Sequence, residues 1–211
     1  KFLITDMSAF YLDILKDRLY CEGKNSIERR SAQTVLLKLL EVITKILTPI
    51  LTFTSEEVYE YFPEKMRKYE TVQLEKWPEY DENIMDLELL EKYERINKLR
   101  EDVLKALEMA RNEKKIGNPL DANVKIKIKD EKIMEDLKTL SMENIADIFI
   151  VSGVELSDNV TQYEGSVAII DVEFSEGEKC ERCWKYSKET GKNESFPATC
   201  PRCSKVLENN E

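Results

Sequence analysis

Residues 179–203 read KCERCWKYSKETGKNESFPATCPRC and contain two C-x-x-C pairs, Cys180 with Cys183 and Cys200 with Cys203. The spacing of the two pairs falls within the C-x₂-C-x₁₅₋₂₀-C-x₂-C pattern of zinc sites. Each pair can present two thiolates on one tight turn, and two such turns supply the four sulfurs of a tetrahedral Zn²⁺ site. A disulfide or a redox-active C-x-x-C would not explain two matched pairs. We therefore predict one zinc ion, and because protein ligands fill all four positions, a structural zinc.

The residues beside these cysteines include many basic side chains and a tryptophan. Segment 179–211 holds more basic than acidic residues, whereas the whole chain has 32 Lys and Arg against 42 Asp and Glu. One interpretation is that the basic residues only balance the charge of about −2 on a zinc with four thiolates. The other is that Trp184, flanked by Arg182 and Lys185, stacks on an unpaired base while the cations hold its phosphates.

The composition is that of a globular protein with a highly charged surface. The chain has 211 residues, of which 42% are hydrophobic and 35% charged, and this length predicts one or two domains. We find no apolar run of the roughly 18 residues that a membrane helix needs, and no signal peptide. The paired cysteines and the odd Cys21 favour a reducing, intracellular setting. Because the first residues, starting at Lys1, already have helical spacing, we expect a piece of a larger protein.

The first 85 residues show helical spacing of apolar positions. This pattern predicts helices over 1–22, stopped by Gly23, and over 27–48. Residues 54–57, Thr-Ser-Glu-Glu, resemble a capping box that would start a third helix running through Phe62. A short helix is expected over 64–69. Together these elements predict an antiparallel helical bundle over residues 1–85.

The middle of the chain has a different pattern. An extended connector is expected over 71–83, a long helix over 84–115, and a strand over 124–128, where apolar residues alternate with lysines that form a basic outer face. Residues 131–140 are predicted helical, 148–151 extended, and 166–174 a strand whose inward side chains are Ile170, Val172 and Phe174. The fold class is therefore mainly α: a bundle over 1–85, a small α/β subdomain over 86–178, and a four-cysteine zinc finger over 179–211. The subdomain is the acidic part of the chain and the part least suited to face phosphates.

Three segments, taken in chain order, carry a resemblance to a known family. Residues 10–36, FYLDILKDRLYCEGKNSIERRSAQTVL, are similar to the start of the anticodon-binding helical domain of class I aminoacyl-tRNA synthetases. Residues 107–126, LEMARNEKKIGNPLDANVKI, resemble the helix-to-strand junction after that bundle in bacterial-type isoleucyl-tRNA synthetases. The motifs KCERCWKY and CPRC within 179–203 resemble their C-terminal zinc finger. The segments span nearly the whole chain, so the resemblance is specific.

The resemblance implies a tRNA-binding C-terminal region of an isoleucine–tRNA ligase, whose parent enzyme attaches isoleucine to tRNA(Ile) with ATP. The implied partners are the anticodon stem-loop of that tRNA and the catalytic domain of the same chain. A membrane partner is not implied, and we expect a cytoplasmic monomer. One structural Zn²⁺ is implied here, and ATP only in the catalytic domain. The zinc ligands would be Cys180, Cys183, Cys200 and Cys203, and the candidate RNA contacts are Arg182, Trp184, Lys185, Lys16, Arg18, Arg29 and Arg30.

The sequence departs from the family's catalytic signatures. It contains no histidine, so the HIGH motif that binds ATP in class I synthetases is absent, and no KMSKS loop is found. The carboxylates do not form an isolated pair in an apolar setting that would tune them for acid–base work. Cys21 has no histidine to act as its base, so we expect it to be inert packing. This part of the parent enzyme is therefore not expected to catalyse a reaction.

Two alternatives from other functional classes stay open. The chain could be a protein-interaction module whose zinc ribbon grips another protein. It could also be a nucleic-acid binder similar to DNA-repair glycosylases, one group of which ends in the same type of finger. That likeness covers only the last thirty or so residues, and the N-terminal part does not resemble a glycosylase.

Overall fold

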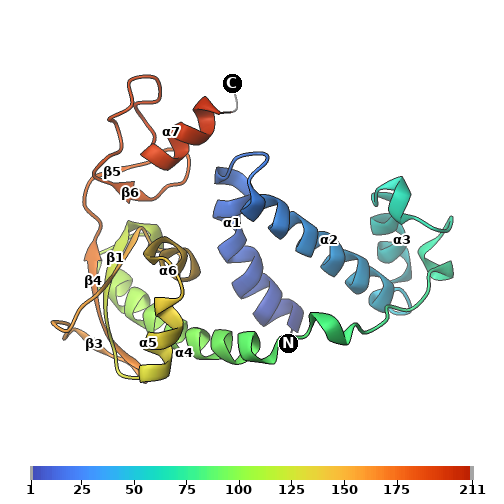
Figure 1. Ribbon diagram of the computed structural model, residues 1–211, viewed down its shortest axis with the longest axis horizontal. Coiled ribbons are helices and arrows are strands. Elements are labelled where there is room, and N and C mark those ends of the chain that lie inside the picture. The colour runs from blue at the N-terminus through green and yellow to red at the C-terminus, as the bar shows by residue number, and fades with distance from the viewer. Residues whose placement is uncertain (1, 210–211) are drawn as a thin grey trace. The chain divides into compact units, whose positions relative to one another are not determined.

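The computed structural model describes residues 2–209 of the chain (Figure 1). Lys1 and residues 210–211, which the predicted first helix and the predicted finger include, lie outside the described residues. By its contacts the chain divides into two compact units, one formed by residues 25–85 and the other by the residues up to 24 together with 86 onward. A bundle over residues 1–85 and the domain boundaries at 85 and 178 stay predictions.

The unit of residues 25–85 contains two helices, α2 (Ile27–Leu47) and α3 (Thr52–Glu60), followed by short 3₁₀ turns. Helix α2 begins where Ser26 caps it by accepting the backbone N–H of Arg29 at 3.1 Å. The capping box predicted at residues 54–57 is wrong: α3 starts at Thr52, and its N-cap residue, Leu51, makes no side-chain cap bond. The hydroxyl of Thr52 instead donates to the Thr48 carbonyl oxygen at 3.0 Å.

A small core holds the short turns of this unit against α3. It consists of Tyr59, Phe62 and Val72. The Tyr59 hydroxyl donates to a carboxylate oxygen of Glu75 at 2.7 Å, and Lys45 on α2 pairs with the same carboxylate at 3.2 Å. Burial opposes ionisation of Glu75, but these hydrogen bonds hold its pKa below the usual value. Of the short helix predicted over 64–69, only the 3₁₀ turn Glu64–Met66 forms. The connector predicted as extended over 71–83 contains the 3₁₀ turn Val72–Leu74 and runs into a second one, Glu82–Ile84.

The other unit starts with a π-helical segment, Leu3–Tyr11, that continues directly into α1 (Leu12–Cys21). The helix ends where Glu22 turns to an extended conformation just before Gly23, as the sequence predicted. A long helix, α4 (Leu87–Asn112), begins at the Asp86 cap and carries the apolar stripe expected of a core helix.

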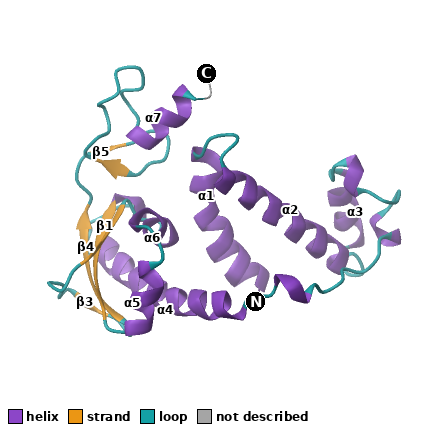
Figure 2. Cartoon of the chain, in the orientation of Figure 1, coloured by secondary structure: helices purple, strands orange, loops and turns teal. Residues whose placement is uncertain are grey.

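A four-stranded sheet with the order β2-β1-β4-β3 forms the centre of this unit (Figure 2). Its strands are β1 (Ala122–Ile128), β2 (Gly153–Leu156), β3 (Tyr163–Glu164) and β4 (Ala168–Phe174). Strand β1 pairs parallel with β2 and antiparallel with β4, and β3 is antiparallel to β4. The strands predicted over 124–128 and 166–174 are thus the two central strands of the sheet, and they are hydrogen-bonded to each other.

Helices α4, α5 (Glu131–Lys138) and α6 (Met142–Phe149) pack on one face of this sheet and share one core with it. The register places Val124 opposite Val172 and Ile126 opposite Ile170, and all four side chains are buried. The predicted inward position of Phe174 is wrong, since its side chain is 51% exposed at the end of β4. The opposite face carries the lysines, and Lys125 pairs with Glu173 across the strands at 2.8 Å.

The predicted extended segment 148–151 is also wrong. Residues up to Phe149 belong to helix α6, and Ile150 ends the helix in the left-handed conformation with a φ of 58°. Glycine is the usual residue at such a position because it has no Cβ. A β-branched isoleucine there hides the helix end from sequence analysis. The strand that follows, β2, is not predicted by the sequence analysis.

Asp102 on α4 holds the loop between β3 and β4 inside this unit. Its carboxylate is 1% exposed and accepts the backbone N–H of Val167 at 2.8 Å and the hydroxyl of Ser166 at 3.1 Å. Burial opposes ionisation, but these hydrogen bonds hold the pKa of Asp102 below its usual value. A buried carboxylate with these donors therefore fixes the loop to the helix.

The chain ends in a finger made of the hairpin β5 (Glu178–Lys179) and β6 (Tyr186–Ser187) and of helix α7 (Pro201–Glu208). Gly177, just before β5, has a φ of 94°, and a Cβ there would lie 2.3 Å from the Ser187 backbone. This close approach of two backbones requires glycine. Among the described helices, none is long and apolar enough to cross a membrane.

We predict that Asp102→Asn lowers the free energy of unfolding by about 1–3 kcal/mol at neutral pH, because the amide leaves a buried N–H without an acceptor. Since the pKa of Asp102 is lowered in the folded state, its contribution is fully present above the unfolded pKa of about 3.9 and is lost as the pH falls through the folded pKa. Urea unfolding at several pH values should show the two proteins converge in acid. Glu101→Gln, at the exposed neighbouring position, is the control, and an equal effect of both changes would contradict this role.

Candidate metal centre and nucleic-acid interface

The four cysteines that the sequence predicted as ligands lie together in the finger. Their sulfur atoms are all within 4.8 Å of one another, and the Sγ atoms of Cys183 and Cys200 are 3.8 Å apart. Zn–S bonds of about 2.3 Å in a tetrahedron place the sulfurs about 3.8 Å apart. All four side chains are buried. The cluster therefore fits one structural zinc.

The local backbone explains how two turns deliver four sulfurs. In the first turn the Trp184 N–H donates to the Cys180 carbonyl at 2.8 Å, and the Cys180 N–H donates to the Lys185 carbonyl at 2.9 Å. The second pair sits at the start of α7, where Cys200 is the N-cap residue and Pro201 occupies the first turn. The Cys200 N–H points at the Cys180 sulfur at 3.3 Å, so the two turns are joined at the metal centre.

Because the thiols lie so close together, they need a nearby cation to become thiolates. A hydrogen bond shared with Cys200 raises the pKa of the Cys183 thiol to about 11, and a hydrogen bond from Cys183 raises the pKa of Cys203 further. Zinc ligands must be thiolates, and metal binding releases the protons. Without a metal, Cys183, Cys200 and Cys203 would therefore be neutral thiols at physiological pH.

Cys21, the fifth cysteine, packs against this cluster. Its side chain is buried among the four ligand cysteines although it comes from the end of α1. Its Sγ donates to the Arg182 carbonyl oxygen at 3.5 Å. The expected role as packing agrees with this position, but the sequence did not show that the packing partner is the metal centre.

Arg182 and Lys185 have partners inside the chain. The Arg182 guanidinium donates to the carbonyl oxygens of Tyr20, at 3.3 Å, and of Cys21. Lys185 forms an ion pair with Asp147 on α6. Both were predicted to contact RNA, and those contacts stay predictions, but the structure shows what these side chains already bind.

Trp184 is the predicted contact whose ring faces solvent. It is 59% exposed and has a φ of 65°, a left-handed conformation that is unusual for a bulky residue. Lys179 lies over the ring with its Nζ 5.9 Å from the ring centroid, within the range of a cation–π interaction. The sequence analysis missed Lys179 as a candidate, although its place directly before Cys180 was a usable signal. The turn thus presents an aromatic face beside a cation.

The four other predicted RNA contacts lie on different helices. Lys16 and Arg18 are on α1, where Lys16 is exposed and pairs with Asp13 at 2.6 Å and Arg18 is half-buried. Arg29 and Arg30 are in the first turns of α2, in the unit of residues 25–85. Arg30 is exposed and, with Ile27 and Thr34, borders a shallow hollow on that helix. Lys16 and Arg18 thus share α1, and Arg29 and Arg30 share the start of α2. Residues one or two positions apart on a helix do not face each other, so neither pair forms a common basic patch.

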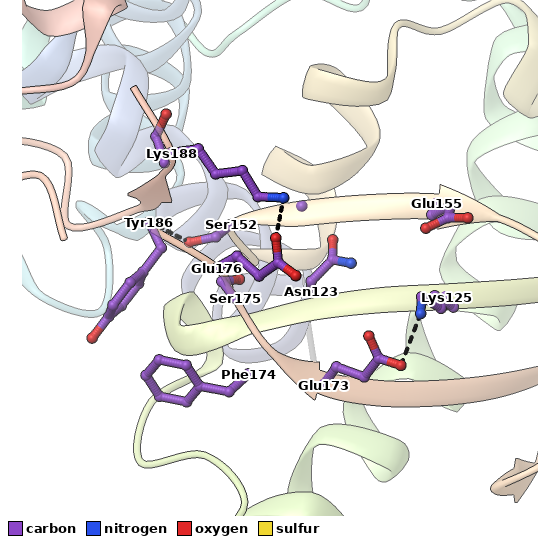
Figure 3. A pocket seen from close by; sticks show the side chains of 12 residues that line it. Asn123, Lys125, Ser152, Glu155, Glu173, Phe174, Ser175, Glu176, Tyr186 and Lys188 are labelled. Carbon is purple, nitrogen blue, oxygen red and sulfur yellow. Dashed lines mark hydrogen bonds and ion pairs between the residues drawn. The ribbon is translucent and has the colours of Figure 1, made fainter. Parts of the chain in front are cut away.

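A hollow of about 410 Å³ lies between the polar face of the sheet and strand β6 (Figure 3). Three glutamates and two lysines line it, and both lysines are paired, Lys125 with Glu173 and Lys188 with Glu176. The Asn123 amide lies over Gly153, where a Cβ would come within 2.4 Å of its oxygen. The excess of carboxylates makes this hollow unsuited to phosphates.

Comparison with known proteins agrees with the geometry. Residues 1–126 match the family described as the anticodon-binding domain of tRNA ligase. The chain belongs to this family. Residues 177–206 match a second family, the zinc finger found in FPG and IleRS, and this match covers all four clustered cysteines.

Individual relatives give the same result over nearly the whole chain. The chain is 58% identical over 207 residues to an isoleucine–tRNA ligase of Kosmotoga olearia, and 50% identical over 207 residues to one of Thermotoga petrophila. An isoleucine–tRNA ligase of Carboxydothermus hydrogenoformans is 48% identical over 208 residues. Each match covers 98% of this chain and 22% of the relative, so the chain spans about a fifth of the length of these relatives.

We predict that Cys203→Ala abolishes zinc binding, whereas Cys21→Ala leaves about one zinc per chain, because only the first change removes a sulfur from the tetrahedron. Metal content after gel filtration measures this directly. Chelating the zinc should also expose the backbone of residues 179–205 to hydrogen exchange, since metal binding supplies much of the folding energy of such a small motif. Loss of zinc in Cys21→Ala, or a finger that stays protected after chelation, would contradict the assignment.

Proposed function

We propose that this chain is the tRNA-binding C-terminal region of a bacterial-type isoleucine–tRNA ligase and that it holds the anticodon stem-loop of tRNA(Ile). The observation that carries the proposal is the exposed ring of Trp184 beside Lys179, on a zinc-bound turn of a chain from the anticodon-binding family. The choice of isoleucine and of its tRNA rests on the names of the relatives, which are isoleucine–tRNA ligases.

The chemistry of the parent enzyme would take place outside this chain. In the proposal, the catalytic domain of the same polypeptide attaches isoleucine to the tRNA with ATP, in the cytoplasm, and this region supplies only RNA affinity and the structural zinc. The absence of histidine, and with it of the HIGH motif, supports this division of work. We further propose that the enzyme is a monomer, with the tRNA and its own catalytic domain as partners.

In the proposed binding mode, an aromatic residue contacts an unpaired base and basic residues contact the phosphates. Anticodon bases are single-stranded and can be splayed onto an aromatic ring, which is the usual way in which proteins read RNA loops. Trp184 would stack on one such base while Lys179 contacts its phosphate. The exposed basic residues Lys16 and Arg30 would contact the stem or loop backbone, with Arg18 and Arg29 near them in the sequence. Arg182 and Lys185, which the sequence predicts as RNA contacts, would also hold the Trp184 turn in place through their bonds to the end of α1 and to Asp147.

The net charge of −10 limits the affinity of this region by itself. The acidic residues are concentrated in 86–178, and several are used inside the fold, among them Asp102 and Asp171. We expect binding to be weak and strongly dependent on salt when the catalytic part is absent.

Two other functions receive less support. A protein-interaction module would use the finger but would not account for the anticodon-binding match over residues 1–126. A glycosylase-like binder shares only the finger match over residues 177–206.

The proposal predicts that this chain binds an isoleucine anticodon stem-loop more tightly than a valine stem-loop, and that Trp184→Ala weakens binding about 5- to 150-fold. Stacking of one base on an aromatic ring contributes about 1–3 kcal/mol, which corresponds to this range. Fluorescence anisotropy at about 50 and 150 mM salt would measure both quantities.

Two variants serve as controls for this measurement. Trp184→Phe keeps an aromatic face and should retain most of the affinity. Trp77→Ala removes the other tryptophan, which is 62% exposed in the unit of residues 25–85, and should have little effect. Equal and feeble binding to both stem-loops, unaffected by Trp184→Ala, would contradict the proposal and favour a protein-interaction module.

A further inference from the structure

We propose that Arg182 and Arg202 are positioning residues that make the zinc finger a clamp on the C-terminal end of helix α1. Each of them occupies the third position of a C-x-x-C pair, and each reaches the same helix end. Zinc binding would then fold the finger and also hold residues 17–24 in an ordered conformation. This inference concerns the unit that contains both elements and does not depend on what the finger binds.

The first contact of the clamp is a bidentate ion pair. Arg202 on α7 donates to both carboxylate oxygens of Asp17, at 2.5 and 2.7 Å, and to Glu22 at 3.2 Å. The three side chains are at least two-thirds buried. Two parallel hydrogen bonds between a guanidinium and a carboxylate fix orientation as well as distance, and partial burial protects them from screening by salt. Asp17 lies one turn before the end of α1, and Glu22 is its C-cap residue.

The second contact caps the same helix. The last carbonyl groups of a helix have no partner within it, and a cation at this end also interacts favourably with the helix dipole. The Arg182 guanidinium donates to two of these groups, the carbonyls of Tyr20 and Cys21. The contact is reciprocal, because the Cys21 thiol donates back to the Arg182 carbonyl oxygen at 3.5 Å. Arg182 therefore donates hydrogen bonds to carbonyl groups that have no partner within α1.

The position of both arginines between ligand cysteines couples the clamp to the metal. Arg182 directly precedes Cys183, and Arg202 directly precedes Cys203. Coordination of these two sulfurs therefore determines the backbone position from which each arginine side chain extends. Loss of the ion would release both arginines together, since metal binding supplies much of the folding energy of such a small motif. The Lys185 ion pair with Asp147 attaches the finger to α6 and not to α1, so it would not replace the clamp.

The clamp also accounts for Cys21. The Cys21 thiol is buried against the four ligand sulfurs, so the end of α1 fits closely against the finger. This contact forms only if the end of α1 is held at the finger. The same contacts keep Trp184 in a fixed place relative to α1, which carries Lys16 and Arg18.

Hydrogen exchange on the zinc-loaded full chain tests the clamp, with the amides of residues 17–21 as the readout. We expect Arg182→Ala combined with Arg202→Ala to speed their exchange about tenfold or more, the change that corresponds to the loss of about 1.5 kcal/mol from one charged hydrogen bond. The zinc content should stay near one per chain, and the amides of Trp184 and Ser204, which bond within the two turns, should stay protected. Chelation of the wild-type protein should produce the same acceleration at residues 17–21.

Two further variants keep the test decisive. Lys205→Ala removes an exposed cation from the same helix, α7, and should change nothing. Asp17→Asn combined with Glu22→Gln breaks the Arg202 contact of the clamp from the helix side and leaves the Arg182 contact in place. It should reproduce part of the acceleration even if the arginine variants lose zinc. The proposal is overturned if residues 17–21 stay protected in the zinc-loaded helix-side variant, or if chelation exposes the finger and leaves residues 17–21 protected.

Discussion

The finger depends on one constraint: four sulfurs within 4.8 Å of one another can be ionised only around a cation. A segment of about thirty residues cannot bury enough apolar surface to fold by itself. In the part of the finger that the structure describes, the buried cluster is made of the four ligand cysteines together with Cys21 of α1. The metal therefore takes the place of a hydrophobic core. The turns, the hairpin β5–β6 and the start of α7 follow from the need to direct four sulfurs at one point.

Buried charge has a second structural use in the larger unit. Asp102, Asp121 and Asp171 are all nearly buried, and each accepts backbone N–H groups of a loop: Val167 for Asp102, Gly117 and Asn118 for Asp121, and Thr161 and Gln162 for Asp171. Carboxylates that accept such bonds satisfy loop backbone that would otherwise be buried without partners. Part of the acidity of residues 86–178 is thus a property of the fold and not of the surface.

The positive charge of the finger is likewise smaller than its sequence suggests. Arg202, Lys185 and Lys188 are paired with carboxylates, and Arg182 caps a helix. The balance of charge around a thiolate-rich site and the contact with RNA were two interpretations of the same residues. The structure adds a third use, attachment of the finger to α1 and α6. Among the residues that it leaves facing solvent are Trp184 and Lys179, whose Nζ lies over the indole ring. The left-handed backbone of Trp184 is of the kind that is typical of functional positions.

The sequence by itself determined the metal centre, most helices, the two central strands and the family, because these depend on local spacing. A C-x-x-C pair, a helical stripe and an alternating strand can each be recognised within ten or twenty residues. The tertiary structure alone decided the roles of Arg182, Arg202 and Cys21, whose partners lie about 160 to 185 residues away. It also decided that Phe174 is exposed and that α6 ends at an isoleucine, where no local signal marks the end. Spacing predicts which elements form, but only packing determines which side chains their ends meet.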